Sequence, residues 1–127
     1  MNLSILAAAA LSALTLIAHF FGGGPQYHTP AMASSLSIED KAVYTIIWHA
    51  ITTILTINTL GLAYAAISEK FRFSFAALIS AQYISWGLLF VFFGQARLGE
   101  LWTLPQWIAF FLIPALAIWG IKESFQK

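Results

Sequence analysis

Four apolar segments, each long enough to cross a lipid bilayer, make up most of this 127-residue sequence. They cover about residues 3–21, 38–66, 73–94 and 103–121. A membrane-spanning helix needs roughly 20 apolar residues. Only 9% of the residues here are charged, whereas a soluble domain has about a quarter. We therefore expect an all-α integral membrane protein, in which residues 1–127 form one domain, a four-helix transmembrane bundle.

The ends of the first two segments carry further signals. Ser37, followed three residues later by Asp40, resembles a capping box and predicts that the second helix begins there. That helix is longer than a bilayer requires, so it should tilt or protrude. No basic residue precedes the first segment, and Phe20-Phe21-Gly22 is a poor cleavage site. We interpret the first segment as a retained helix rather than a signal peptide.

The basic residues predict which way the helices cross the membrane. Cytoplasmic loops carry an excess of lysine and arginine. Four of the six basic residues lie between the second and third segments or after the fourth, which predicts cytoplasmic termini and an inner (plasma) membrane location. The four are Lys70, Arg72, Lys122 and Lys127, and the two on the outer side are Lys41 and Arg97.

Each of the first two segments carries a polar stripe at helical spacing. A membrane helix does not present such a stripe to lipid, so both should face other helices or a wet cavity. In the second segment, the stripe should contact lipid less than Ile46, Ile54 and Leu60 do. The stripes are Ser4, Ala8, Ser12, Thr15 and His19 in the first segment, and Thr45, His49, Thr52, Thr56 and Thr59 in the second.

All three histidines are expected near the outer surface. His19 lies at the outer end of the first segment, His49 lies just inside the outer boundary, and His28 lies in the connection between the two segments. Neutral imidazole is a ligand for zinc, copper or haem iron and a proton carrier near neutral pH. The three histidines are therefore candidate metal ligands, and Tyr44, Thr15 and Thr52 join His19 and His49 in a candidate pocket. The alternative is that each histidine forms a hydrogen bond between helices.

The outer connections supply the remaining candidates. Residues 22–37 are expected to form an outer loop, in which three glycines and two prolines suit either a lid over the bundle or a plain connector. Gln95 and Arg97 lie at the outer end of the third segment and are assigned to the pocket. Arg97 either pairs with Glu100 at the surface or binds an anionic lipid headgroup or substrate group.

Composition excludes several functions. The sequence has no cysteine, which removes disulfides, thiolate metal sites and a cysteine nucleophile. It has no basic patch, so no nucleic-acid partner is expected. No charged residue lies at the middle of a span, which argues against a proton-driven transporter.

Gln82 and Ser85, near the middle of the third segment, are expected to pack against Asn58 and the threonines of the second helix.

The plan of four short-looped helices with a glycine-rich outer loop is loosely similar to the small bacterial DoxX-like membrane proteins. His-Phe-Phe-Gly-Gly at residues 19–23 is the local sequence that carries this resemblance. Membrane glutathione transferases share the size and the number of helices. Their Arg- and Glu-bearing second-helix motif has no counterpart between Thr45 and Thr59. We assign the chain to neither family.

Three functions remain open. The leading hypothesis is a membrane protein whose histidine-lined polar pocket, near the outer face, binds a metal ion, a haem-type or quinone-type cofactor, or an amphiphilic ligand. The alternative is an accessory or assembly subunit of a larger membrane complex, without a ligand of its own. The third is an enzyme that acts on a lipid-soluble substrate, which the lack of carboxylates in the spans disfavours. Membrane lipids are the expected surroundings, and small residues on the helices would also permit a homo-oligomer.

Overall fold

The computed structural model describes residues 1–126, and within them it contains only helices and the turns that connect them. Four of its continuous helices are long and apolar enough to cross a membrane. In chain order the elements are α1 (Leu3–Ile17), the π-helical segment η1 (Ala18–His28), α2 (Thr29–Ala33), α3 (Ile38–Ile67), α4 (Arg72–Phe93), the π-helical segment η2 (Gly94–Leu98) and α5 (Trp107–Ser124). Lys127, one of the four basic residues assigned to the cytoplasmic side, lies outside the described residues.

The second and third helices agree closely with the sequence expectation. Ser37 begins α3, because its hydroxyl accepts a hydrogen bond from the Asp40 backbone N–H at 3.0 Å. This is the N-terminal half of the expected capping box. The third helix starts at Arg72 and continues past Phe93 as η2, so it extends four residues beyond the expected end.

The prediction of an outer loop over residues 22–37 is wrong for most of that segment. α1 continues through η1 and α2 as one helix, Leu3–Ala33, and only residues 34–37 connect it to α3. Glycine and proline disfavour an α-helix, but η1 has a wider repeat, in which the Thr29 N–H donates to the Gly24 carbonyl five residues earlier. The segment also packs against α3, and that contact outweighs its weak helix propensity. A Cβ on Gly23 would lie 3.0 Å from the Trp48 ring, so glycine permits this close approach.

The start of the fourth helix also differs from the expectation. Residues 103–106 form turns, and α5 begins at Trp107. Pro105 accounts for the later start, because proline disfavours helical geometry at the residue before it. The resulting helix has 18 residues, which is about 27 Å of helix.

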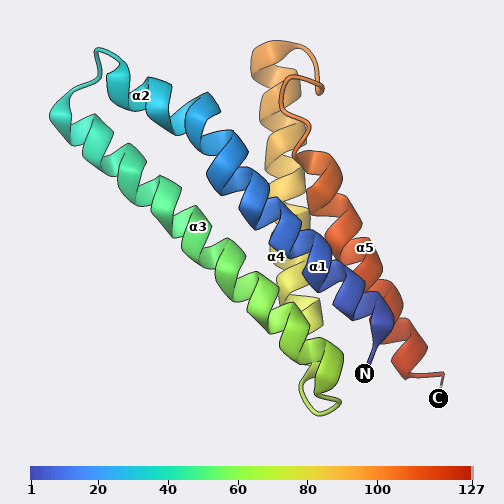
Figure 1. The fold of residues 1–127 in the computed structure, drawn as a ribbon. Helices are drawn as coiled ribbons and strands as arrows, with labels where there is room; N and C mark the ends of the chain where they lie inside the picture. Colours follow the sequence, from blue (N-terminus) through green and yellow to red (C-terminus); the bar gives the residue numbers. More distant parts are fainter. Residues whose placement is uncertain (127) are drawn as a thin grey trace.

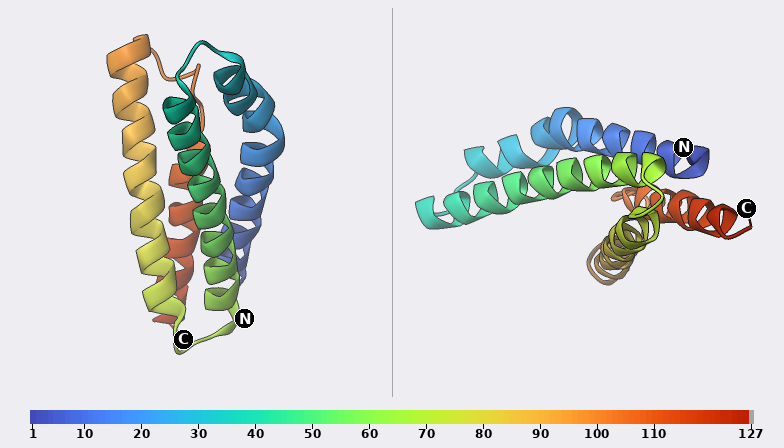
Figure 2. Two further views of the ribbon diagram at one scale, coloured as in Figure 1. Left: turned by 90° about the vertical axis from the view of Figure 1, so that its left-hand side faces the viewer. Right: turned by 90° about the horizontal axis from the view of Figure 1, so that it is seen from below.

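The helices form two antiparallel hairpins. The first consists of the α1–η1–α2 helix and α3, and the second of α4–η2 and α5. Figure 1 shows that the hairpins meet near both chain termini and lean apart toward the opposite end, and Figure 2 shows the same divergence from below. We call the end with the termini and the α3–α4 turn the terminal end, and the opposite one the distal end.

Small residues let the helices approach closely toward the terminal end. Alanines 8, 9, 65, 66, 76 and 117 are all buried there or near it. A Cβ on Gly61 would lie 2.7 Å from the Ile79 side chain, which marks where α3 and α4 touch. A Cβ on Gly120 would lie 2.5 Å from the Ile5 side chain, where α5 crosses α1. Close backbone contact of this kind is typical of helix packing in membranes.

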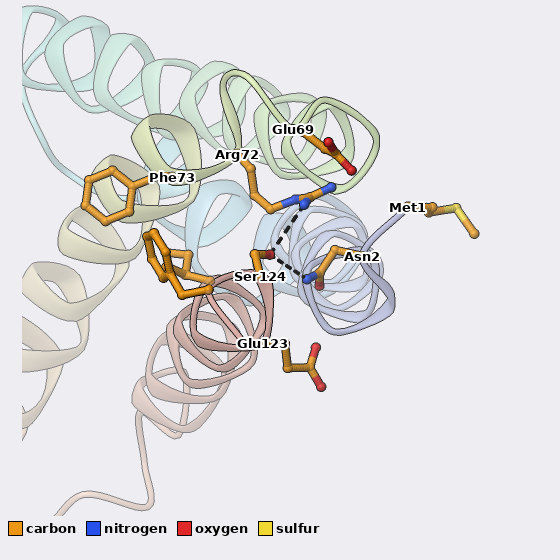
Figure 3. Close-up of a pocket in the computed structure, with 9 residues that line it drawn as sticks. Met1, Asn2, Glu69, Arg72, Phe73, Glu123 and Ser124 are labelled. Atoms are coloured by element: carbon orange, nitrogen blue, oxygen red, sulfur yellow. Dashed lines mark hydrogen bonds between the residues drawn. The ribbon is translucent and has the colours of Figure 1, made fainter. Parts of the chain in front are cut away.

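A group of polar side chains joins the helices at the terminal end, and Figure 3 shows its central members. The Asn2 backbone N–H donates to the Ala66 carbonyl at 2.7 Å, and its side-chain amide donates to the Gly120 carbonyl at 2.7 Å. The Ser4 hydroxyl donates to the Glu123 carboxylate at 2.9 Å. The start of α1 is thereby tied to the ends of α3 and α5. We call this group the terminal cluster: Asn2, Ser4, Arg72, Glu123 and Ser124.

Candidate functional site

A cleft of about 1120 Å³ lies between the two hairpins in the distal half of the molecule. We call it the distal cleft. Its walls come from η1 and α3 on one side and from α4 and α5 on the other. Among the described residues that line it, none is aspartate, glutamate, lysine or arginine. The cleft is therefore uncharged, and aliphatic and aromatic side chains make up most of its wall.

Aromatic rings face the cleft from both hairpins. On the first, the imidazole of His19 stacks on Trp48, with ring centroids 4.1 Å apart and planes inclined by 21°. On the second, the Phe110 ring lies 5.7 Å from that of Trp86 and 5.3 Å from that of Phe90. The two distances on the second hairpin fall in the usual range of favourable aromatic pairs, and the His19–Trp48 pair is a closer stack. Rings thus flank the space between the hairpins on both sides.

The hydrogen bonds around His19 favour one assignment of its ring proton. Its Nε2 lies 3.0 Å from the Thr52 hydroxyl oxygen. The single proton of that hydroxyl is donated to the Trp48 carbonyl at 3.1 Å. With the Thr52 proton on that carbonyl, the Thr52 oxygen accepts from His19, and Nε2 is the protonated nitrogen. In the neutral ring Nδ1 remains as a hydrogen-bond acceptor.

A polar contact bridges the two hairpins at the distal cleft. The side-chain amide nitrogen of Gln106, at the start of α5, lies 3.5 Å from the Tyr27 hydroxyl of η1. The amide oxygen of Gln106 is buried and has no hydrogen-bond partner. Buried polar atoms are almost always paired in native proteins. Because the oxygen lies just beneath the cleft surface, a bound molecule can donate to it once the Gln106 amide turns toward the cleft.

The structure gathers some of the expected pocket residues and separates others. Thr15, His19 and Tyr44 line the distal cleft, and Thr52 contacts it indirectly by binding His19. Gln95 and Arg97 do not line it, because they are exposed on η2. Four further residues line the cleft that were not expected in the pocket: Tyr27, Trp48, Trp86 and Gln106. Their part in it depends on contacts between distant segments, which helical periodicity within one segment does not reveal.

The other two histidines lie outside the cleft lining. The His28 ring is 6.0 Å from the His49 ring and 5.5 Å from the Trp48 ring, and its Nε2 is 3.4 Å from the Thr45 hydroxyl. Within residues 1–126, no group of three His, Cys, Asp or Glu side chains is arranged to hold a metal ion. The expected metal site on His19, His28 and His49 is therefore without structural support.

The polar stripe of α3 is only partly buried. Thr45, Thr52 and Thr59 are partly buried as expected, but His49 and Thr56 are exposed. The Thr56 hydroxyl donates to the Thr52 carbonyl of its own helix at 2.9 Å, so it needs no partner on another helix. The three apolar residues of α3 that were expected to contact lipid more than the stripe does are also not all exposed. Ile46 and Leu60 are exposed, whereas Ile54 is partly buried in the cleft wall.

A second hollow, of about 500 Å³, lies at the terminal end beside Arg72. The Arg72 side chain donates to the Ala65 carbonyl at 3.2 Å, the Ala66 carbonyl at 3.4 Å and the Ser124 hydroxyl at 3.4 Å. Figure 3 shows it reaching toward Ser124 and Asn2. A cation beside the carboxyl ends of helices stabilises their dipoles. These contacts give Arg72 a structural role in holding the helix ends together.

Comparison with protein-family models, with curated proteins and with solved structures finds no match to this chain.

Proposed function

We propose that this chain is a small multi-pass membrane protein that binds an amphiphilic small molecule in the distal cleft. The observation that carries the proposal is the cleft itself, an uncharged, aromatic-walled space of about 1120 Å³ with a few polar groups. Pockets for small molecules usually have volumes of about 300–1,000 Å³ and combine mostly apolar walls with a few oriented polar groups. The distal cleft matches that description in its lining and is slightly larger than this range.

The orientation of the protein completes the proposal. Lys70, Arg72 and Lys122 lie at the terminal end, whereas Lys41 and Arg97 lie toward the distal end. By the excess of positive charge, the terminal end faces the cytoplasm and the distal cleft opens toward the outer face of the inner membrane. A ligand would place its apolar part between the aromatic walls and its polar part near His19, Tyr27 and Gln106.

Filling the cleft tests the proposal. Ala109 lines the distal cleft, and Ala115 is exposed on the same helix. Ala109→Phe should fill part of the cleft, while Ala115→Phe adds the same ring on the outer surface of α5. Each protein is purified in mild detergent, and its solvent extract is compared by mass spectrometry. We expect a lipid-soluble compound in the native and Ala115→Phe extracts that is lost from the Ala109→Phe extract.

The accessory-subunit alternative has one observation in its favour. His49 and Thr56 are exposed on α3, where another membrane protein could cover them. Identical extracts from the native protein and from both phenylalanine variants would overturn the ligand-binding proposal and leave this alternative. In that case His49→Leu should weaken co-purification with the complex, because it removes a polar group from the proposed contact.

A further inference from the structure

We propose that the ligand of the distal cleft is a lipid whose head is an uncharged, hydroxylated aromatic ring, of the alkylphenol or prenylated hydroquinone class. This inference rests on the proposed function and narrows it to one class of ligand. Three features of the cleft carry it: the lack of charge, the aromatic walls and the unpaired oxygen of Gln106.

The lack of charge excludes ionic head groups. No acidic or basic residue lines the cleft, and both Arg97 and Glu100 are exposed beyond it. A phosphate, carboxylate or quaternary ammonium group in this space would be removed from water without a counter-ion, which is strongly unfavourable. Phospholipids, fatty acids and cationic amphiphiles are therefore poor ligands for the cleft.

The walls favour a flat ring. The stacked pair of His19 and Trp48 forms one wall, and Trp86 with its neighbour Phe110 forms part of the other. Aromatic rings attract one another in offset-stacked and edge-to-face arrangements. A planar head group finds such a partner on either wall, whereas a saturated or branched head group gains only the burial of its surface.

The unpaired polar atoms at the cleft are acceptors, so they favour a ligand that donates a hydrogen bond. The amide oxygen of Gln106 is buried without a partner, and its amide nitrogen lies 3.5 Å from the Tyr27 hydroxyl. In the tautomer whose Nε2 proton is directed to Thr52, His19 offers a second acceptor, Nδ1. A ring hydroxyl can donate to either acceptor, whereas the same ring with methoxy groups can donate to neither.

The surroundings of the cleft leave a path for the lipid tail. The bridge between Tyr27 and Gln106 joins η1 to the start of α5 on one side. On the side of α3 and α4, the lining consists of apolar residues such as Ile47, Ile51 and Leu89. These two helices touch lower down, at Gly61 and Ile79. A tail can therefore leave between α3 and α4 into the bilayer, which suits a ligand that arrives through the membrane.

Four lipids that share one decyl tail test the head group. They are 5-decylresorcinol, its dimethyl ether, decyl phosphate and decyltrimethylammonium. Binding to the purified protein in detergent is measured by titration calorimetry, with the rise in Tm as an independent readout. We expect 5-decylresorcinol to bind about tenfold more tightly than its dimethyl ether, because a buried acceptor without a donor is unfavourable. The two charged lipids should bind more weakly still.

A matched pair of variants tests whether Gln106 causes the preference for 5-decylresorcinol over its dimethyl ether. Gln106→Leu keeps the approximate size of the side chain and removes the acceptor, whereas Gln95→Leu makes the same change at an exposed position outside the cleft. Gln106→Leu should reduce the resorcinol preference to about threefold or less, since His19 remains. Gln95→Leu should leave the preference unchanged. Both variants report a ratio of affinities, which a general loss of stability does not alter.

The outcomes separate this inference from the proposed function. Equal binding of all four lipids, tighter binding of a charged one, or an unchanged preference in Gln106→Leu would overturn the inference. If none of the four binds while the Ala109→Phe extract still loses a compound, the head-group assignment is wrong and the cleft remains a ligand site. If the extracts of native, Ala109→Phe and Ala115→Phe protein are identical, the proposed function itself fails.

Discussion

A chain of hydroxyl groups connects three helices directly below the distal cleft. The Thr59 hydroxyl donates to the Leu55 carbonyl at 2.8 Å, so its oxygen accepts from Ser12 at 2.7 Å. Since the Ser12 proton is used in that bond, the Tyr83 hydroxyl must donate to Ser12, at 2.6 Å. Proton counting thus orders the chain from Tyr83 through Ser12 and Thr59 to Leu55. The Tyr83 ring also lies 5.8 Å from that of Phe110 in the cleft wall.

The middle of this chain should matter more than its beginning. Ser12→Ala leaves the buried Tyr83 hydroxyl without an acceptor, whereas Tyr83→Phe removes that donor altogether. We expect Ser12→Ala to lower the free energy of unfolding by about 1–2 kcal/mol and Tyr83→Phe by less, since hydrogen bonds between membrane helices average about 0.6 kcal/mol. Denaturation in mixed micelles measures both. Ser85→Ala is the control, because Ser85 is exposed and bonds only to its own helix. The reverse order of the first two variants would contradict the proton assignment.

The sequence predicted part of this chain and misplaced the rest. Ser12 and Thr59 were expected to face other helices, because both lie on polar stripes. On α4 the expectation was that Gln82 and Ser85 would pack against α3. Ser85 is instead exposed and Gln82 is only partly buried, while Tyr83 between them is fully buried. α4 is apolar around most of its circumference, so its polarity gives little information about which face points inward.

At the scale of the helical elements, η1 depends on its contact with α3 more than on its own sequence. Trp48 is the centre of that contact, because it stacks on His19 and lies against Gly23. Periodicity could not predict this helix, since the expected effect of Gly22, Gly23, Gly24 and Pro25 was to end it. The contacts with α3 that stabilise it come from residues far along the chain, 17 positions apart for His28 and Thr45 and 33 for His19 and Thr52.

Removal of the Trp48 ring should therefore loosen η1 selectively. In Trp48→Ala, we expect amide hydrogen exchange to increase about three- to tenfold in residues 18–33, since the loss of an aromatic contact is worth about 0.5–1.5 kcal/mol. Exchange in the terminal half of α1 should change little, because the terminal cluster holds it. Mass spectrometry of peptides from protein in detergent measures both regions. Trp119→Ala, at the exposed terminal end, is the matched control. Equal increases in the two regions would show that η1 has no special dependence on Trp48.

The stability of the protein should be sensitive to one methyl group added where α1 crosses α5. A Cβ on Gly120 would lie 2.6 Å from the Asn2 side-chain oxygen as well as 2.5 Å from the Ile5 side chain. Gly120→Ala should lower the free energy of unfolding by about 1–3 kcal/mol, the usual range for an overpacked core. Gly22→Ala is the control, because a Cβ there meets nothing within 4 Å. Denaturation in mixed micelles compares the two, and equal stabilities would contradict the close packing at the terminal end.

At the scale of the whole molecule, the distal cleft follows from the unequal hairpins and their divergence. The helices of the first hairpin span 31 and 30 residues, whereas α5 has 18. The first hairpin is therefore about 45 Å long and α5 about 27 Å. Hydropathy predicted four long helices because the length of each apolar segment can be read from that segment alone. The cleft was not predictable in the same way, because it depends on the angle at which the hairpins meet, and contacts such as Gly61 with Ile79 set that angle.

We propose that the distal cleft faces outward, and the topology tests this orientation directly. Alkaline phosphatase, which is active only outside the cytoplasm, should be inactive when fused after Lys127 and active when inserted at residues 34–36. In the sequence, four of the six basic residues lie between the second and third spans or after the fourth, and two lie in the segments expected on the distal side. Lys70→Gln with Lys122→Gln reduces the four to two, which equals the distal count. We expect this double variant to insert in mixed orientations, with phosphatase activity appearing at the C-terminal fusion. Arg72 is left unchanged because it holds the ends of α3 and α5. An active C-terminal fusion on the native chain would instead turn the cleft toward the cytoplasm, where its ligand would have to come from the inner leaflet.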